Sequence, residues 1–120
     1  MIRGVRGATT VEENSQEEIM ANTRELVLEM IEKNNIVASD VTSAIVTVTT
    51  DLNAGFPARS IREMPGWKYV PVMCMQEIEV PNGLPRCIRV MMTVNTNIEQ
   101  DQVKHIYQRE AKTLRPDLLD

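Results

Sequence analysis

The residues of this 120-residue chain that are best suited to chemistry are arginines in predicted strands and turns. A guanidinium group binds a carboxylate through two parallel hydrogen bonds, so clustered arginines suit an anionic ligand. Arg89 is the clearest case, because an arginine buried in a strand without a partner costs several kcal/mol. Its anion comes either from a ligand or from a glutamate at a subunit interface. The arginines of this kind are Arg3, Arg6, Arg59, Arg62, Arg86, Arg89 and Arg115.

Glu77 and Cys74 lie near each other in a second predicted strand. They differ by an odd number of positions, so an unbroken strand directs their side chains to opposite faces. Both can line one pocket only if the strand bulges or ends between them. Taken alone, Glu77 is a solvated carboxylate at a strand end, and Cys74 and Cys87 are reduced, half-buried thiols in strands.

Composition excludes several classes of function. Thirteen basic and seventeen acidic residues give a net charge of −4, which disfavours a nucleic-acid binder. No apolar run approaches the roughly 20 residues that span a bilayer, and no apolar segment follows the basic N-terminus, so we expect a soluble, cytoplasmic protein. With one histidine and no CxxC spacing, we expect no metal site. The lone His105 is expected at the surface or in a helix cap, inside a helical turn near Gln102 to Tyr107.

One long helix and four strands are predicted to position these residues. Ser15 and Glu18 form an S-x-x-E capping box that begins the helix, and Asn34-Asn35 ends it. The apolar face that recurs at helical spacing consists of Ile19, Thr23, Leu26, Val27, Met30 and Ile31. Strands are expected at Ile2 to Arg6, Ala44 to Thr50, Trp67 to Glu79 and Arg86 to Thr96. A helical turn is expected from Pro57 through Met64, and an irregular tail follows Tyr107 and ends at Leu114-Arg115-Pro116.

The last of these strands has two apolar faces. Ile88, Val90, Met92 and Val94 share one face, while Cys87, Arg89, Met91 and Thr93 share the other. One long helix covers only one face of a sheet, so the second face is predicted to meet another subunit. We therefore expect a single domain over residues 1–120, an α+β protein with a mixed sheet that forms an oligomer.

Six segments in order along the chain resemble the trimeric α/β chorismate mutases and not the all-helical ones. They are RGVRGATTV (3–11), FPA (56–58), GWKYVPV (66–72), CMQE (74–77), CIRVMMTV (87–94) and LRPDL (114–118). The resemblance implies a homotrimer in which three sheets close into a pseudo-barrel, with active sites at the subunit interfaces. It also implies an isomerase of aromatic amino-acid biosynthesis (the shikimate pathway) that converts chorismate to prephenate without a cofactor.

The resemblance assigns site residues by position. One subunit contributes Arg6, Cys74, Glu77, Arg89 and Tyr107. The neighbouring subunit contributes a wall of Phe56, Ala58, Arg59 and Arg62, and the pocket is further lined by Val72, Met73 and Leu114. Met73 stands where the family commonly has Thr, and Arg59 where it has Lys; neither change removes a charge.

The reaction that the resemblance implies is an intramolecular Claisen rearrangement, which needs no nucleophile and no proton transfer. Arg89 is expected to meet negative charge on the ether oxygen, and Arg6 to bind a substrate carboxylate. Glu77 is expected to accept a hydrogen bond from the ring hydroxyl, with Cys74 as a lesser contact.

Two alternative functions keep the trimer and change its role. The first rests on fold analogy alone: the small trimeric deaminases of enamines and imines have a similar fold, and in that role Arg89 would bind the substrate carboxylate and Glu77 would place water. In the second, a non-catalytic trimer binds a metabolite of the aromatic pathway and regulates a partner. Loss of chorismate, release of ammonia, or no reaction distinguishes the three.

Overall fold

The computed structural model describes residues 1–115. Seven helices and strands of this part of the chain make up the domain: β1 (Ile2–Thr10), α1 (Gln16–Asn34), β2 (Val41–Val48), α2 (Ala58–Arg62), β3 (Val72–Gln76), β4 (Cys87–Asn95) and β5 (Ile106–Tyr107). Short 3₁₀ turns lie at Ala38–Asp40, Gln100–Gln102 and Arg109–Thr113. No helix in residues 1–115 has the length and apolar character needed to cross a bilayer.

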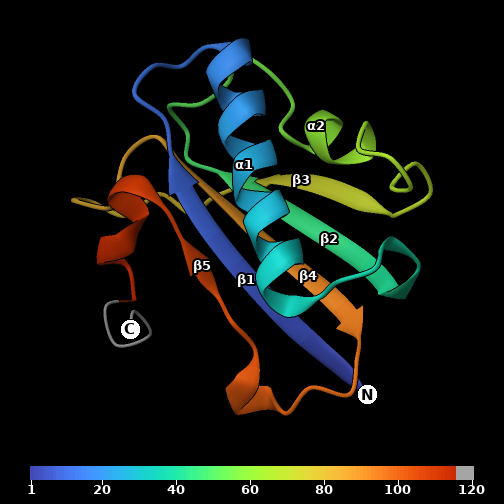
Figure 1. The fold of residues 1–120 in the computed structure, drawn as a ribbon. Coiled ribbons are helices and arrows are strands. Elements are labelled where there is room, and N and C mark those ends of the chain that lie inside the picture. Colours follow the sequence, from blue (N-terminus) through green and yellow to red (C-terminus); the bar gives the residue numbers. More distant parts are fainter. Residues whose placement is uncertain (116–120) are drawn as a thin grey trace.

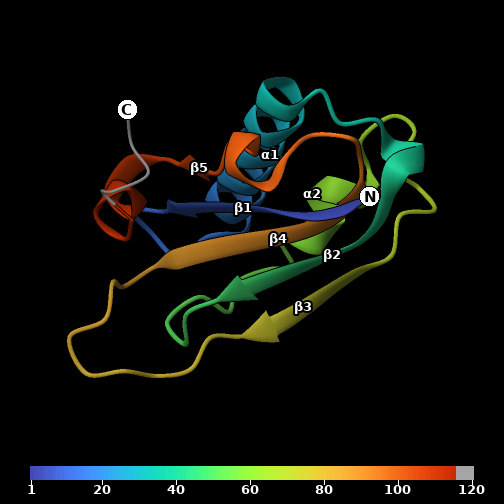
Figure 2. The same cartoon turned by 90° about the horizontal axis from the view of Figure 1, so that it is seen from below.

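The strands form one mixed sheet in the order β3-β2-β4-β1-β5 (Figure 1). β4 lies at the centre and pairs antiparallel with β1 and β2, while the edge strands β5 and β3 pair parallel with β1 and β2. Both helices lie on the same side of this sheet, as Figures 1 and 2 show together. The predicted α+β fold, with a mixed sheet packed by one long helix, is confirmed.

The beginning and end of α1 follow from local sequence. The Ser15 side chain accepts a hydrogen bond from the Glu18 backbone N–H at 3.1 Å, as the capping box predicts. Glu18 does not complete the box, because its carboxylate accepts from the backbone N–H groups of Glu12 and Glu13 in the preceding loop. At the other end, Asn35 adopts a left-handed conformation (φ 51°) that stops the helix.

The core lies between α1 and the sheet. Ile19, Leu26, Val27 and Met30 of α1 are fully buried against the apolar face of β4. Gly7 of β1 allows α1 to approach this closely. A Cβ atom at this position would lie 2.5 Å from the Met30 sulfur and 3.0 Å from Leu26 Cδ1, so a side chain at position 7 would force the buried Met30 and Leu26 side chains to move.

The face of the sheet opposite the helices is covered only in part within residues 1–115. Leu84, Ala111 and Leu114 pack over Ala8 and Tyr107, while the part formed by β2, β3 and the neighbouring residues of β4 is exposed and partly apolar. Ile45 of β2, Met73 and Met75 of β3, and Met91 of β4 are between 36% and 61% exposed on this face. Ile45 pairs with both Met73 and Met91 across the sheet, so these side chains form one continuous patch. This is the two-faced character predicted for the segment Arg86 to Thr96.

Four predicted elements differ from the structure. β2 begins at Val41, three residues before the predicted Ala44, because Val41 already pairs with Val94 of β4, and it ends at Val48. β1 continues past Arg6 to Thr10, because all nine of its residues pair with β4. β3 begins only at Val72, since the residues before it fold into turns in which Val70 N–H donates to Trp67 O and Trp67 is buried. The predicted helical turn near Gln102 to Tyr107 is wrong: β5 lies there, because the edge of β1 offers backbone groups that a turn would leave unpaired. The irregular tail contains a 3₁₀ turn up to Thr113, and Pro116 lies outside the described residues.

Candidate active site

A row of paired residues crosses the face of the sheet opposite the helices. Arg89 of β4 pairs with Thr47 of β2 on one side and with Ala8 of β1 on the other, and Ala8 also pairs with Tyr107 of β5. Paired residues direct their side chains to the same face, and Gly7 faces α1, so this row faces away from the helices. Ala8 and Tyr107 are buried on this face together with Ala111, and Leu84 and Leu114 pack against them.

Unpaired polar atoms gather around Ala8. In residues 1–115, the buried side-chain polar atoms without a hydrogen-bond partner are Nε of Arg6, Nε of Arg89 and the hydroxyl of Tyr107. Arg6 lies two positions before Ala8 on β1 and shares its face. A buried donor without a partner costs about 1–3 kcal/mol, and more when it is charged. Arg89 Nε lies near the Glu77 carboxylate, so Nε of Arg6 and the Tyr107 hydroxyl are the donors of this set that most need a ligand.

Glu77 lies at the other end of this row. Its backbone N–H donates to Val48 O, which extends the β2–β3 ladder one residue beyond β3. The Thr47 hydroxyl donates to Glu77 Oε2 at 2.5 Å, and Arg89 Nε lies 3.6 Å from the same oxygen, too far for a hydrogen bond. The Glu77 side chain is only 20% exposed, so it is not the solvated strand-end carboxylate that its position alone suggests. Glu77 and Arg89 line a cavity of about 350 Å³.

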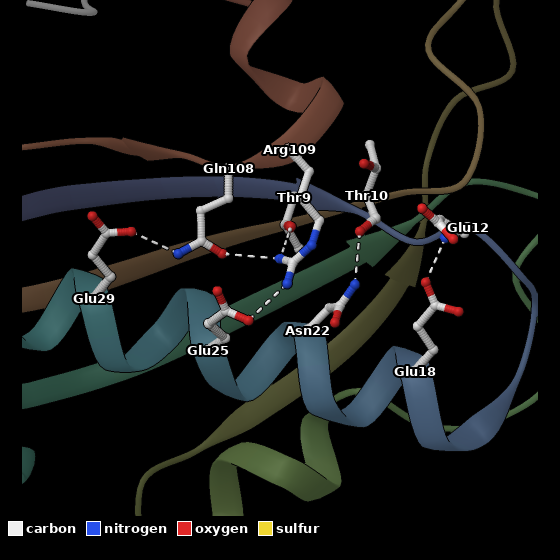
Figure 3. A network of polar contacts seen from close by, with 9 residues as sticks. All are labelled: Thr9, Thr10, Glu12, Glu18, Asn22, Glu25, Glu29, Gln108 and Arg109. Atoms are coloured by element: carbon white, nitrogen blue, oxygen red, sulfur yellow. Dashed lines mark hydrogen bonds and ion pairs between the residues drawn. The ribbon is translucent and has the colours of Figure 1, made fainter.

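The chain after β5 is anchored to α1 and β1 through Gln108 and Arg109 (Figure 3). Gln108 donates from its side chain to Glu29 at 2.6 Å and from its backbone to Ala8 O at 2.9 Å. Arg109 donates to Glu25 at 2.7 Å and to the Thr9 hydroxyl at 3.1 Å. Because these contacts flank Tyr107 on its C-terminal side, they hold its ring beside Ala8.

Cys74 lies on the opposite face of the sheet from Glu77 and Arg89. It pairs with the fully buried Val46 and packs against the core below the helices. The β2–β3 register runs without a bulge from Val72 to Gln76, so the parity argument from the sequence holds. Cys74 instead lines a groove of about 570 Å³ with Phe56 and Arg59. Within one chain, therefore, Cys74 belongs with these two residues and not with Arg89.

A hollow of about 690 Å³ at the C-terminal end of α1 is less suited to an anionic ligand. Its lining includes Asn34, Asn97 and Ile98, and Asp40 is its one ionisable side chain. An acidic group with no arginine beside it repels a carboxylate. Unlike this hollow, the cavity lined by Glu77 and Arg89 carries a cation.

Comparison with known proteins identifies the family. Residues 2–118 match the family model of chorismate mutase type I. The chain belongs to the type I chorismate mutase family. It is 52% identical over 118 residues to the chorismate mutase AroH of Bacillus subtilis (strain 168), and 49% identical over 119 residues to that of Thermus thermophilus. These alignments cover 98% of this chain and 93% and 97% of the two relatives.

A solved structure agrees with this assignment. The chorismate mutase from Clostridium thermocellum superimposes with a TM-score of 0.89 at 50% identity, covering 92% of this chain and 97% of that one. The predicted enzyme class is confirmed: the chain is a chorismate mutase, an isomerase of aromatic amino-acid biosynthesis. This result argues against both alternatives, the deaminase-like enzyme and the non-catalytic binding trimer.

The site residues predicted for the chorismate mutase fall into two groups in the structure. Arg6, Glu77, Arg89 and Tyr107 face one side of the sheet, and Leu114 packs beside Ala8 and Tyr107. The residues predicted for the neighbouring wall lie on the other side. Phe56 is 75% exposed and Arg62 is also exposed, whereas Ala58 is buried and Val72 packs against the core. Arg59 forms an ion pair with Glu63 at 2.7 Å. Met73 is exposed on the edge strand β3, in line with Ile45, Met91 and Arg6.

Three residues of this site were not predicted from the sequence. Thr47 and Ala8 owe their places to the pairing of strands that are far apart in the chain, and a single sequence does not reveal register. His105 was expected at the surface or in a helix cap, but it is half-buried before β5, and its ring accepts a hydrogen bond from the Arg6 backbone. Its status as the only histidine of the chain was the available signal.

Proposed function

We propose that this chorismate mutase rearranges chorismate to prephenate in a cleft between two subunits. The cluster of Arg6, Glu77, Arg89 and Tyr107 on one subunit forms one side of the cleft. The groove of Phe56, Arg59 and Cys74 on its neighbour forms the other. The observation that carries this proposal is that Nε of Arg6, Nε of Arg89 and the Tyr107 hydroxyl have no hydrogen-bond partner within residues 1–115, because chorismate is a dianion that would accept hydrogen bonds from them.

Binding orients the substrate. Arg6 grips one carboxylate of chorismate through the planar fork of its guanidinium. The Tyr107 hydroxyl and Arg62 of the neighbouring subunit hold the enolpyruvyl arm folded over the ring. Folding brings the two carbon atoms that will bond close together, and this loss of conformational freedom precedes the reaction.

The chemical step moves electrons within the substrate alone. The ether C–O bond breaks while a new C–C bond joins the enolpyruvyl arm to the ring, and no proton enters or leaves. Negative charge gathers on the ether oxygen, and Arg89 donates to it. A fixed cation that meets charge present only in the transition state lowers the barrier selectively.

Glu77 acts on the ring side of the substrate. Its carboxylate accepts a hydrogen bond from the ring hydroxyl, while Thr47 holds Oε2 in place. The negative charge of Glu77 also balances cationic charge that develops on the ring as the C–O bond lengthens. Cys74, reaching the site from the neighbour's groove, is a contact and not a nucleophile.

A homotrimer suits this arrangement. The two groups of site residues face opposite sides of one sheet, so they meet only between chains. The exposed apolar patch of Ile45, Met73, Met75 and Met91 gives the subunits a surface to bury. Both cysteines are free, as is usual in a reducing compartment, so we place the enzyme in the cytoplasm.

The test is a comparison of chorismate disappearance in the ultraviolet for wild type, Arg89→Ala, Arg89→Lys and Arg24→Ala. Loss of one donor to a developing charge costs about 10²–10³ in rate, so Arg89→Ala should lose at least a hundredfold in kcat/KM. Arg89→Lys should stay low, because an ammonium does not reproduce the fork. Arg24→Ala, which removes an exposed arginine of α1, is the matched control and should be unchanged.

The outcomes separate function from mechanism. An active wild type in which Arg89→Ala is barely slower would refute the assignment of Arg89 as the ether-oxygen donor. An inactive wild type would refute the function, whatever the variants do.

A further inference from the structure

His105 takes the place of a strand residue beside Arg6. β5 pairs parallel with β1 only at Gly7 with Ile106 and at Ala8 with Tyr107. At Arg6, the residue before Gly7 on β1, the backbone N–H donates to a side chain instead: its acceptor is Nδ1 of His105 at 2.9 Å. The ring therefore extends the edge of the β1–β5 pair to the residue that we assign to a substrate carboxylate.

The segment that carries His105 is fixed from several sides. Asn34 of α1 accepts from Lys104 N–H and donates to Lys104 O, both at 2.8 Å. After the histidine, Gln108 N–H donates to Ala8 O at 2.9 Å. With the backbone held on both sides, the imidazole has a defined position, and the half-buried Arg6 receives a fixed acceptor.

The contact requires one protonation state of the ring. Nδ1 can accept only when it carries no hydrogen, so the imidazole is neutral with its proton on Nε2. Burial lowers the pKa of His105, and the charges of Arg6 on β1 and Arg115 in the C-terminal segment lower it further. The group that α1 presents to this segment, Asn34, is neutral. A protonated ring would turn an N–H toward the N–H of Arg6 and place a second cation next to it.

We propose that neutral His105 is a positioning residue that fixes the backbone of Arg6 and so aims its guanidinium at the substrate carboxylate. This inference depends on the proposed role of Arg6 in binding chorismate. It assigns to the only histidine of the chain a part in substrate affinity and not in the chemical step.

The proposal predicts a division between KM and kcat. His105→Leu removes the acceptor and leaves the Arg6 N–H unpaired, so KM should rise about tenfold while kcat changes less than threefold. His105→Asn offers an amide oxygen the same number of bonds from Cα as Nδ1, so it should return KM to within about twofold of wild type. Lys104→Gln, which alters the exposed neighbouring side chain and no contact of its backbone, is the matched control.

The dependence of KM on pH distinguishes the proposed role from a loss of packing, which would not change with the protonation of His105. In wild type, KM should rise as pH falls below about 6.5 and through the lowered pKa of the ring, because protonation abolishes the acceptor. His105→Asn should show no rise of KM over the same range, and His105→Leu should have a high KM at every pH.

Nuclear magnetic resonance tests the contact without chorismate. In ¹⁵N-labelled protein, the single histidine should give one unprotonated Nδ1 and one protonated Nε2 at neutral pH, and the Arg6 amide resonance should shift when the ring titrates. A protonated Nδ1 at neutral pH would overturn the proposal, as would a wild-type KM profile shared by His105→Asn. Inactivity of wild type would instead refute the proposed function, while the resonance experiment would still decide whether His105 holds Arg6.

Discussion

Cys87 and Arg89 lie two residues apart on the same face of β4, and their environments differ sharply. Cys87 is 1% exposed, whereas the Arg89 side chain is 41% exposed. Burial raises the pKa of the Cys87 thiol, and the positive charge of Arg89 acts in the opposite direction. Burial prevails, so the thiol stays protonated and unreactive beside the cation of the proposed site.

We therefore expect Cys87 to resist alkylation in the native protein. Thiolate is the reacting species, and a protonated, inaccessible thiol reacts slowly even at pH 8. Mass spectrometry after treatment with iodoacetamide should find Cys87 unmodified in native protein and modified in denatured protein. Rapid native modification of Cys87 would show that this part of the sheet opens readily, in conflict with its burial.

At the scale of elements, the close packing of α1 on β1 depends on a residue without a side chain. We expect Gly7→Ala to destabilise the fold by about 1–3 kcal/mol, because the new Cβ would overlap the fully buried Met30. Gly4→Ala is the matched control on the same strand, since its Cβ would lie 3.4 Å from the Met91 sulfur, an ordinary contact. Urea unfolding of both variants measures the difference, and equal midpoints would refute the packing argument.

The anchor of the C-terminal segment is a second feature at this scale. The ion pair between Arg109 and Glu25 is partly exposed, and such pairs contribute little to global stability. Arg109→Ala should therefore lower the free energy of unfolding by less than about 1 kcal/mol. It should nevertheless speed hydrogen exchange of the Gln108 amide, because β5 can open locally once the contacts of Arg109 are lost, without global unfolding.

The control for this prediction is Arg24→Ala, which removes an arginine from the exposed face of the same helix. Unchanged exchange at Gln108 in Arg109→Ala, or equal acceleration in both variants, would contradict the role of the anchor.

At the scale of the whole molecule, the proposed cleft can be tested by combining inactive variants. Arg62→Ala and Arg89→Ala should each lose most activity alone. When they are co-expressed, random trimers should contain about one intact site in four, because Arg62 and Arg89 of one site would come from different chains. The measurement is kcat/KM of the co-purified mixture against each variant.

A pair from the same subunit supplies the control. Arg6→Ala and Arg89→Ala lie on the same face of one chain, so no mixed trimer would hold both residues intact on one subunit. Recovery in this control, or no recovery with Arg62→Ala and Arg89→Ala, would exclude a site shared in the proposed way.

Local sequence determined several elements of this protein. The cap at Ser15, the apolar spacing of α1 and the left-handed Asn35 depend on residues close together in the chain, so both ends of the helix could be predicted from the sequence. The alternation in β4 likewise predicted a buried face and an exposed one, and from them an oligomer. The resemblance added the family, the reaction and the residues of the candidate site.

Tertiary structure decided what depends on partners distant in the chain. β1 extends to Thr10 and β5 exists at all because strand edges need hydrogen-bond partners, which local patterns do not name. The same pairing aligns Thr47, Arg89 and Tyr107 in one row and leaves Cys74 on the other face. It also brings the ring of His105 to the backbone of Arg6, a contact between residues 99 positions apart. Sequence could name the charged groups, but only the sheet register could bring them together, because register is a property of two strands and not of either one.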